Sequence, residues 1–132
     1  MEIEETLTHI AGGDVTVQFT PHLLPVDRGI LSTIYLHPKA AVSELELTDL
    51  YTKYYSGEPF VRIRSTPPTL KDVRGSNYCD IYTTCDDRTE RIIVVSVIDN
   101  LVKGAAGQAV HNMNLMFGFD ETSGLSAVPL RP

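Results

Sequence analysis

The chain has 132 residues, 42% of them hydrophobic and 21% charged, a composition typical of one globular domain with its own core. The net charge is −6 and the lysines and arginines are scattered, so the basic patch of a nucleic-acid-binding surface is missing. No apolar run reaches the roughly 18 residues that span a membrane, and the acidic beginning "MEIEETL" lacks the apolar core of a signal peptide.

The first half of the chain is predicted to contain two helices and two strands. Apolar residues at helical spacing predict a helix over residues 2–13, which ends at a pair of glycines. Strict alternation of apolar and polar residues predicts a half-buried strand over residues 14–20, and β-branched and aromatic residues predict another over 30–37. The intervening residues 21–29 form a proline-containing loop. A serine followed three residues later by glutamate is a capping box, and it opens a predicted helix over residues 43–57.

The second half is predicted to form three strands and a helix. The strands cover residues 60–64, 78–86 and 91–99, with a loop over residues 65–77 between the first two. The last strand is apolar at nearly every position, so we expect it to be central, with both faces covered. The chain is therefore predicted to adopt an α+β fold, a mixed and mostly antiparallel sheet with helices packed on one face.

The late helix, over residues 104–118, contains two glycines near its start, and each costs roughly 1 kcal/mol relative to alanine. Its apolar residues form a stripe that we expect to face the core: Ala106, Ala109, Val110, Met113, Met116 and Phe117. Another side carries Gly104, Gly107, His111 and Asn114. The glycines allow either close packing against the sheet or the approach of a flat or polar ligand to the helix start. The stretch matches neither phosphate-binding glycine motif.

The two cysteines, Cys79 and Cys85, form no CxxC and have no histidine cluster near them, so no metal site is expected. Six residues apart on one strand, they are separated by about 20 Å, far beyond the reach of a disulfide. Two free thiols fit a reducing, cytoplasmic compartment. Neither cysteine lies at a helix N-terminus or beside a base in the sequence pattern, so neither is expected to be an activated nucleophile.

Four stretches give the sequence a family resemblance: "NLVKGAAGQAVHNMNLM" after an apolar strand, "FTPHLLPVDRGI", "GSNYC" and the ending "GL…PLRP". Together they resemble N-acetyl-gamma-glutamyl-phosphate reductase over essentially all 132 residues. The resemblance implies the C-terminal dimerisation domain of that enzyme, with a fold like the C-terminal domain of glyceraldehyde-3-phosphate dehydrogenase. It corresponds to the later part only. The dinucleotide-binding half, the nucleophilic cysteine and the catalytic histidine of the family are expected outside residues 1–132.

The resemblance also implies a cofactor site for NADP at the start of the late helix. Asn100 would face the nicotinamide carboxamide, and Gly104 would leave room for the ring. Lys103 and Gly107 complete this cofactor side, although Lys103 has the alternative of being a solvated lysine at a helix start.

On the substrate side the resemblance implies His22 and Arg28, which flank the proline-containing loop. The substrate, N-acetyl-gamma-glutamyl phosphate, carries a carboxylate and an acyl phosphate, and arginine suits bidentate anion binding. The alternative is that Arg28 pairs with a local acid and His22 caps a turn. His111 is expected to be a hydrogen-bonded structural residue, and the "GSN" containing Ser76 and Asn77 is expected to form a turn.

The activity implied for the whole enzyme is reduction of the acyl phosphate to N-acetylglutamate semialdehyde through a cysteine thioester, a step of arginine biosynthesis. This chain would supply one wall of the site and the subunit interface of a homodimer, through the sheet face away from its helices. Alone it is expected to be inactive. Two alternatives stay open: a stand-alone dimerisation or ligand-binding module, and the matching domain of aspartate-semialdehyde dehydrogenase. The sequence argues against the latter, because that family carries its catalytic histidine directly after the glycine that matches Gly29, and in this chain Ile30 stands there.

Overall fold

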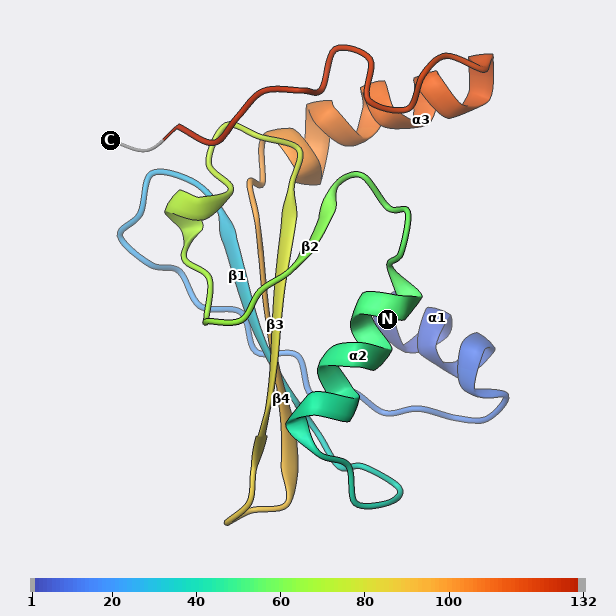
Figure 1. The fold of residues 1–132 in the computed structure, drawn as a ribbon, viewed down its shortest axis with the longest axis vertical. Helices are drawn as coiled ribbons and strands as arrows, with labels where there is room; N and C mark the ends of the chain where they lie inside the picture. Colours follow the sequence, from blue (N-terminus) through green and yellow to red (C-terminus); the bar gives the residue numbers. More distant parts are fainter. Residues whose placement is uncertain (1, 131–132) are drawn as a thin grey trace.

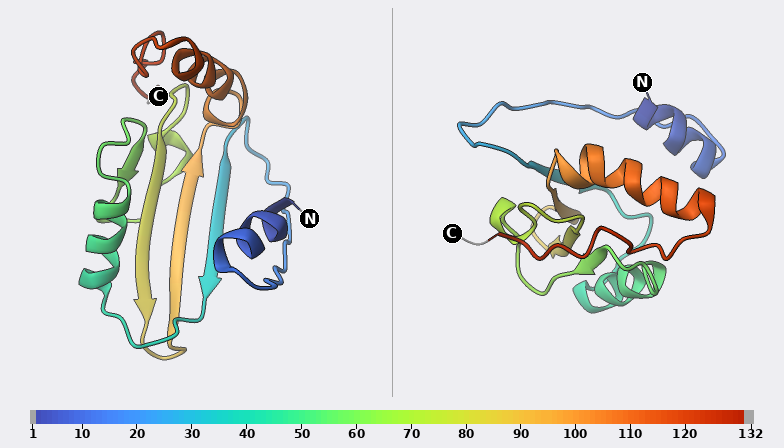
Figure 2. Two further views of the ribbon diagram at one scale, coloured as in Figure 1. Left: turned by 90° about the vertical axis from the view of Figure 1, so that its right-hand side faces the viewer. Right: turned by 90° about the horizontal axis from the view of Figure 1, so that it is seen from above.

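The computed structural model describes residues 2–130, in which the α-helices lie on one side of a four-stranded sheet and the short helical turn at residues 70–72 lies on the other (Figure 1). Figure 2 shows the sheet from that side and from above. The elements in chain order are α1 (Glu2–Ala11), β1 (Ile30–Leu36), α2 (Glu44–Tyr54), β2 (Val61–Ile63), the short η1 (Leu70–Asp72), β3 (Cys79–Asp86), β4 (Arg91–Ile98), η2 (Val102–Ala106) and α3 (Gly107–Phe117).

The sheet has the order β1-β4-β3-β2 and is antiparallel except between β2 and β3, which run parallel. The predicted mixed, mostly antiparallel sheet with helices on one face is confirmed. The strongly apolar strand is β4, and it is central as predicted, paired with β1 on one side and β3 on the other.

The core lies where α2 packs against the sheet. Leu47 of α2 is buried against Ile81, Ile92 and Val94 of the two inner strands. The predicted capping box holds the beginning of this helix, because the Glu46 backbone N–H donates to Ser43 Oγ while the Ser43 backbone N–H donates to Glu46 Oε2. The capped helix start places Leu47 over the sheet, which ties a local sequence signal to core packing.

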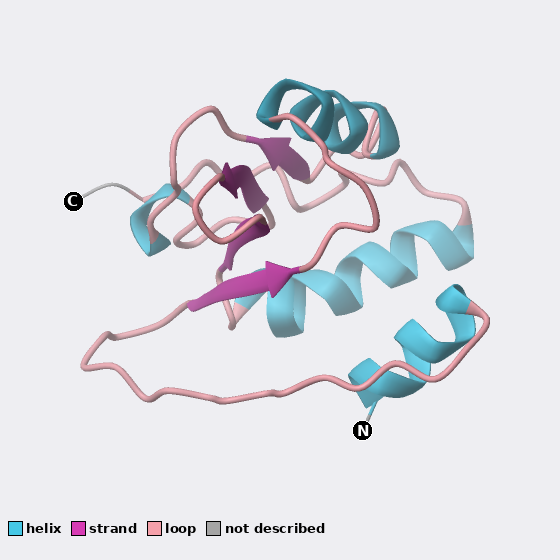
Figure 3. Cartoon of the chain, turned by 90° about the horizontal axis from the view of Figure 1, so that it is seen from below, coloured by secondary structure: helices cyan, strands magenta, loops and turns pink. Residues whose placement is uncertain are grey.

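The strand predicted over residues 14–20 is wrong. These residues run in an extended path from α1 toward β1 with no strand partner within the described residues (Figure 3). The backbone N–H groups of Val15 and Val17 donate to Thr8 Oγ1 and Glu4 Oε1 of α1. Side chains of a helix therefore take the place of a neighbouring strand, and half-burial of the two valines accounts for the alternation.

The late helix also differs from expectation in the face that it buries. The helix crosses one end of the sheet on the side of α1 and α2 (Figure 2), and its buried residues are Gly107, His111 and Asn114. The predicted core stripe is exposed instead, with Met116 80% and Phe117 70% accessible. The polar side is buried because Asn114 Nδ2 donates to the carbonyls of residues 121 and 123, where the chain turns back along the helix.

Candidate functional site

The candidate site lies at the carboxyl end of β4, where the chain leaves the sheet and enters the late helix. Asp99 is 1% exposed there. Its Oδ1 accepts hydrogen bonds from the Leu101 and Val102 backbone N–H groups at 2.9 and 3.2 Å. Its Oδ2 accepts from the Gly75 N–H at 2.6 Å and pairs with the Arg28 guanidinium at 2.6 Å. One buried carboxylate thus joins the strand end, the helix start and two loops.

The electrostatics of this group favour the charged form. Burial pushes the pKa of Asp99 upward, but the Gly75 N–H, the Arg28 guanidinium and the Leu101 N–H together hold it below its ordinary value of 3.8. The carboxylate is therefore ionised at neutral pH, and its contact with Arg28 Nη2 is charge-assisted, which makes it short.

A second bond runs beside the first. The Gly29 N–H donates to Asn100 Oδ1 at 2.6 Å, across 71 positions of the chain. Arg28 is a substrate-side candidate and Asn100 is a cofactor-side candidate. The structure brings them close together, because Arg28 pairs with Asp99, the residue before Asn100, and Gly29, the residue after Arg28, pairs with Asn100 itself. The Asn100 side-chain NH2 has no partner within residues 2–130.

The two glycines of the late helix have different surroundings. A Cβ on Gly107 would lie 2.4 Å from Asn77 Oδ1 and 2.7 Å from the Val102 carbonyl oxygen, so packing alone requires a glycine there. A Cβ on Gly104 would meet nothing closer than Ile98 Cδ1 at 3.5 Å, an ordinary contact, and Gly104 is exposed. Packing accounts for Gly107 and leaves Gly104 without a steric reason.

The turn of helix around Gly104 is wider than an α-helix. The Gly104 N–H donates to the Asp99 carbonyl and the Ala106 N–H donates to the Leu101 carbonyl, each five residues back. Such π-type turns are rare and occur frequently at functional sites. Lys103, on this turn, is half-buried and has its Nζ 5.6 Å from the centre of the Phe60 ring.

The two remaining histidine candidates differ in burial. His22 is exposed, and its Nδ1 is 3.1 Å from the Thr20 carbonyl in its own loop. His111 is buried, with its Nε2 2.6 Å from Glu121 Oε1 and its ring edge-on to Phe60. The prediction of a hydrogen-bonded structural histidine is confirmed for His111, and His22 makes no contact with Asp99.

The turn at "GSN" and the cysteines are also placed. Ser76 is buried and its hydroxyl donates to the Val73 carbonyl, as expected of a turn. Burial raises the pKa of both thiols, although Ser96 Oγ, 3.4 Å from Cys79 Sγ, and the charge of Lys103 oppose the shift at Cys79. A raised pKa is the opposite of what an activated nucleophile needs.

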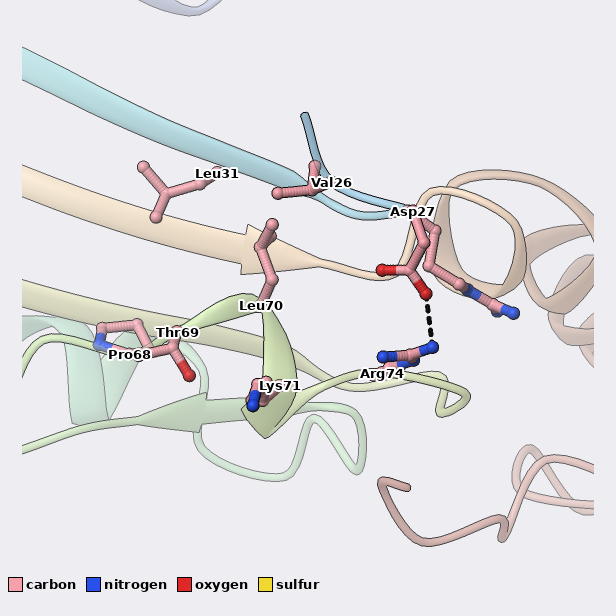
Figure 4. A pocket seen from close by; sticks show the side chains of 9 residues that line it. Val26, Asp27, Leu31, Pro68, Thr69, Leu70, Lys71 and Arg74 are labelled. Atoms are coloured by element: carbon pink, nitrogen blue, oxygen red, sulfur yellow. Dashed lines mark ion pairs between the residues drawn. The ribbon is translucent and has the colours of Figure 1, made fainter. Parts of the chain in front are cut away.

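A pocket of about 400 Å³ opens beside Leu31 and Leu70 (Figure 4), and Arg28 is among the residues that line it. Ile34 pairs with the core residue Val94 and therefore points toward α2. Leu31, three residues earlier on the same strand, points to the opposite face. The pocket therefore lies on the sheet face away from α2. Apolar walls come from Val26, Leu31, Pro68 and Leu70, and polar groups from Asp27, Arg28, Thr69, Lys71 and Arg74. Asp27 and Arg74 form an ion pair at its rim.

Sequence reasoning missed Asp99, the residue that organises this site. The available signal was an aspartate placed directly after an apolar strand and before a helix. An acidic side chain at such a position accepts from the free N–H groups two and three residues on. Its pairing with Arg28 had no local signal.

In residues 2–130 no three histidine, cysteine or acidic side chains group as a metal site requires. None of the helices that the structure describes is long and apolar enough to cross a membrane.

The fold and the motif at the end of β4 define a domain of the semialdehyde dehydrogenase class. The chain belongs to the family described as semialdehyde dehydrogenase, dimerisation domain, whose model matches residues 1–100. Among solved structures it is similar to aspartate semialdehyde dehydrogenase II from Vibrio cholerae, with a TM-score of 0.58 and 21% identity over 72% of this chain and 29% of that one. At that identity the likeness concerns the fold alone.

The particular relatives are N-acetyl-gamma-glutamyl-phosphate reductases, which confirms the resemblance seen in the motifs. The chain is 59% identical to the protein of that name from Geobacter metallireducens and 58% to that from Symbiobacterium thermophilum, in each case over 99% of this chain. The enzyme of Staphylococcus aureus is 54% identical. The chain spans 38% of the length of the first two relatives and 39% of the third.

The glycine surroundings give a first prediction. Gly107→Ala should lower the free energy of unfolding by about 1 to 3 kcal/mol, because the new methyl group overlaps Asn77 and Val102. Gly104→Ala, the matched control three residues earlier, should leave stability unchanged or raise it by up to about 1 kcal/mol. Urea unfolding measures both, and equal losses in the two variants would contradict the packing role of Gly107.

The ionised Asp99 gives a second prediction. Since its pKa is lowered in the folded protein, its contribution to stability is complete above the ordinary value of 3.8 and is lost as the pH falls below it. Asp99→Asn should therefore destabilise the protein most at neutral pH, with a difference from wild type that shrinks below pH 3.8. Urea unfolding across pH tests this, with Asp49→Asn on the exposed side of α2 as the control. A difference that is constant with pH would show that the charge of Asp99 contributes nothing.

Proposed function

We propose that this chain is the dimerisation and cofactor-side part of an NADP-dependent N-acetyl-gamma-glutamyl-phosphate reductase of arginine biosynthesis. The observation that carries the proposal is the 59% identity, over 99% of the chain, to a protein of that name. The geometry at the end of β4 supports it, because the open helix start offers both space and a polar group for a ligand.

The residues at the helix start fit a nicotinamide. Gly104 is exposed and no packing contact explains it, so a flat ring can lie against the backbone there. Asn100 is fixed through its Oδ1 by Gly29, which leaves its NH2 to donate to the carboxamide oxygen. Lys103 adds positive charge beside the site for the cofactor phosphates. When bound, NADPH supplies the hydride that reduces the acyl carbon.

Gly107 belongs to this site through the backbone. It is buried against Asn77 and sets how closely the late helix approaches the turn that contains this residue. We place it among the residues that shape the cofactor wall, with Gly104 as the one that the ring approaches.

On the substrate side Arg28 lies at the pocket, with 27% of its side chain exposed. The carboxylate or acyl phosphate of N-acetyl-gamma-glutamyl phosphate suits the charge of this partly accessible arginine, and the apolar walls suit the hydrocarbon part. His22 is the second substrate-side candidate, carried on the same loop. The nucleophile that forms the thioester comes from outside this chain, since burial raises the pKa of both of its thiols. The free thiols fit the cytoplasm.

The subunit interface is assigned to the sheet face away from the helices. Tyr35 of β1 is 62% exposed on that face, beside the half-buried Ile93, Val95 and Tyr82. Exposed apolar patches of this kind usually mark contact surfaces, and two-fold pairing is the commonest arrangement. A homodimer formed through this face agrees with the family's description as a dimerisation domain.

The test uses the complete polypeptide that contains this chain. It should reduce NADP⁺ in the presence of phosphate and N-acetylglutamate semialdehyde. Gly104→Val should lower kcat/KM about 100-fold, as expected when a reacting group is displaced by about 1 Å. The control is Ala105→Val, which adds a β-branched side chain at the next exposed position of the same turn.

Two results would count against the proposal. Turnover of aspartate semialdehyde in preference to the N-acetylated substrate would overturn the assigned function. Near-normal kinetics of Gly104→Val together with a lower melting temperature would show that this glycine serves the helix and not the cofactor.

A further inference from the structure

We propose that Asp99 is a positioning residue that couples the loop of residues 21–29 to the start of the late helix, so that loss of the Arg28–Asp99 ion pair weakens binding of the nicotinamide cofactor as well as of the substrate. The inference rests on the proposed function for the two ligands. The coupling itself follows from contacts between residues of this chain.

The two oxygens of the Asp99 carboxylate bind different segments of the chain. Oδ1 faces the helix and accepts the Leu101 and Val102 N–H groups, while Oδ2 faces the loops and receives Arg28 and the Gly75 N–H. The carboxylate is planar and rigid, so a shift of Arg28 at one oxygen is transmitted to the helix start at the other. The side chain of Asp99 is fully buried, and water has no access to replace either set of bonds.

A parallel bond fixes orientation as well as distance. Residues 28 and 29 pair with residues 99 and 100 in order, through the ion pair and through the Gly29 N–H to Asn100 Oδ1. Two adjacent attachments stop the loop from rotating about a single contact. Asn100 and the wide turn that contains Lys103 and Gly104 are therefore held by the same loop that presents Arg28 to the pocket.

Arg28 consequently has two tasks. Its guanidinium is held by Asp99 on the buried side, while the side chain lines the pocket on the other. An arginine that only bound the substrate anion would affect substrate binding alone when replaced. An arginine that also holds the loop to the helix affects the binding of both ligands when it is replaced.

The experiment measures NADPH binding to the complete polypeptide by isothermal titration calorimetry, in the absence of substrate so that no turnover occurs. Arg28→Met retains the apolar stem and removes the ion pair, and it should raise the NADPH dissociation constant about 10-fold. Arg28→Lys keeps the positive charge but lacks the planar guanidinium, and it should give a smaller increase in the NADPH dissociation constant. This variant tests the proposal if Arg28→Met does not fold. The control is Arg88→Met, the same substitution at an arginine whose ion pair with Asp86 lies at the β3–β4 turn, at the opposite end of β4 from Asp99. Its NADPH affinity should stay within about twofold of wild type.

Unchanged NADPH affinity in the folded arginine variants, with only the substrate KM raised, would overturn the coupling and leave the proposed function intact. Failure of the unchanged enzyme to bind NADPH would overturn the proposed function and the inference together. Equal weakening by Arg88→Met would also overturn it, because the effect would then follow from the loss of any ion-paired arginine and not from the bridge through Asp99.

Discussion

The end of the sheet is organised by one buried carboxylate. Asp99 receives four donors from three separate segments, and three of the cofactor-side candidates, Asn100, Lys103 and Gly104, lie within five residues of it along the chain. Aspartate suits this place because its short side chain reaches the free N–H groups of the following turn. A buried charge is costly unless it is paired and hydrogen-bonded, and here both oxygens are satisfied. The dependence is mutual, because the carboxylate needs donors from both loops and its contacts hold both loops to the end of the sheet.

The late helix follows from the same constraint. Because Asp99 holds the N–H groups of Leu101 and Val102, the first turn is free to widen into the π-type geometry around Gly104. Gly107 then lets the helix close onto Asn77. Both glycines lower the intrinsic stability of this helix, and each has a separate reason. Gly107 is required by packing within this chain, and Gly104 leaves open the surface that we assign to the cofactor.

Local signals predicted much of the fold. The Ser43–Glu46 capping box and the apolar run of β4 depend on neighbours in sequence, and both were confirmed. The extended segment at Val15 and Val17 was misread because alternation reports half-burial, and a helix supplied the partners that a strand would have given. The exposed stripe at Met116 and Phe117 shows that periodicity identifies an apolar face without identifying what covers it. The bridge from Arg28 to Asp99 is non-local and leaves no periodic trace in the sequence.

Amide hydrogen exchange of the folded protein, followed by NMR, tests most directly whether the Asp99 carboxylate holds the surrounding segments together. The N–H groups of Gly75, Leu101 and Val102 all donate to Asp99, so they should be protected to a similar degree and lose protection together. The amide of the fully exposed Leu23, in the neighbouring loop, should exchange at the rate of an unstructured chain. Exchange of Gly75 and Leu101 as fast as that of Leu23 would contradict the claim that the Asp99 carboxylate holds these segments together.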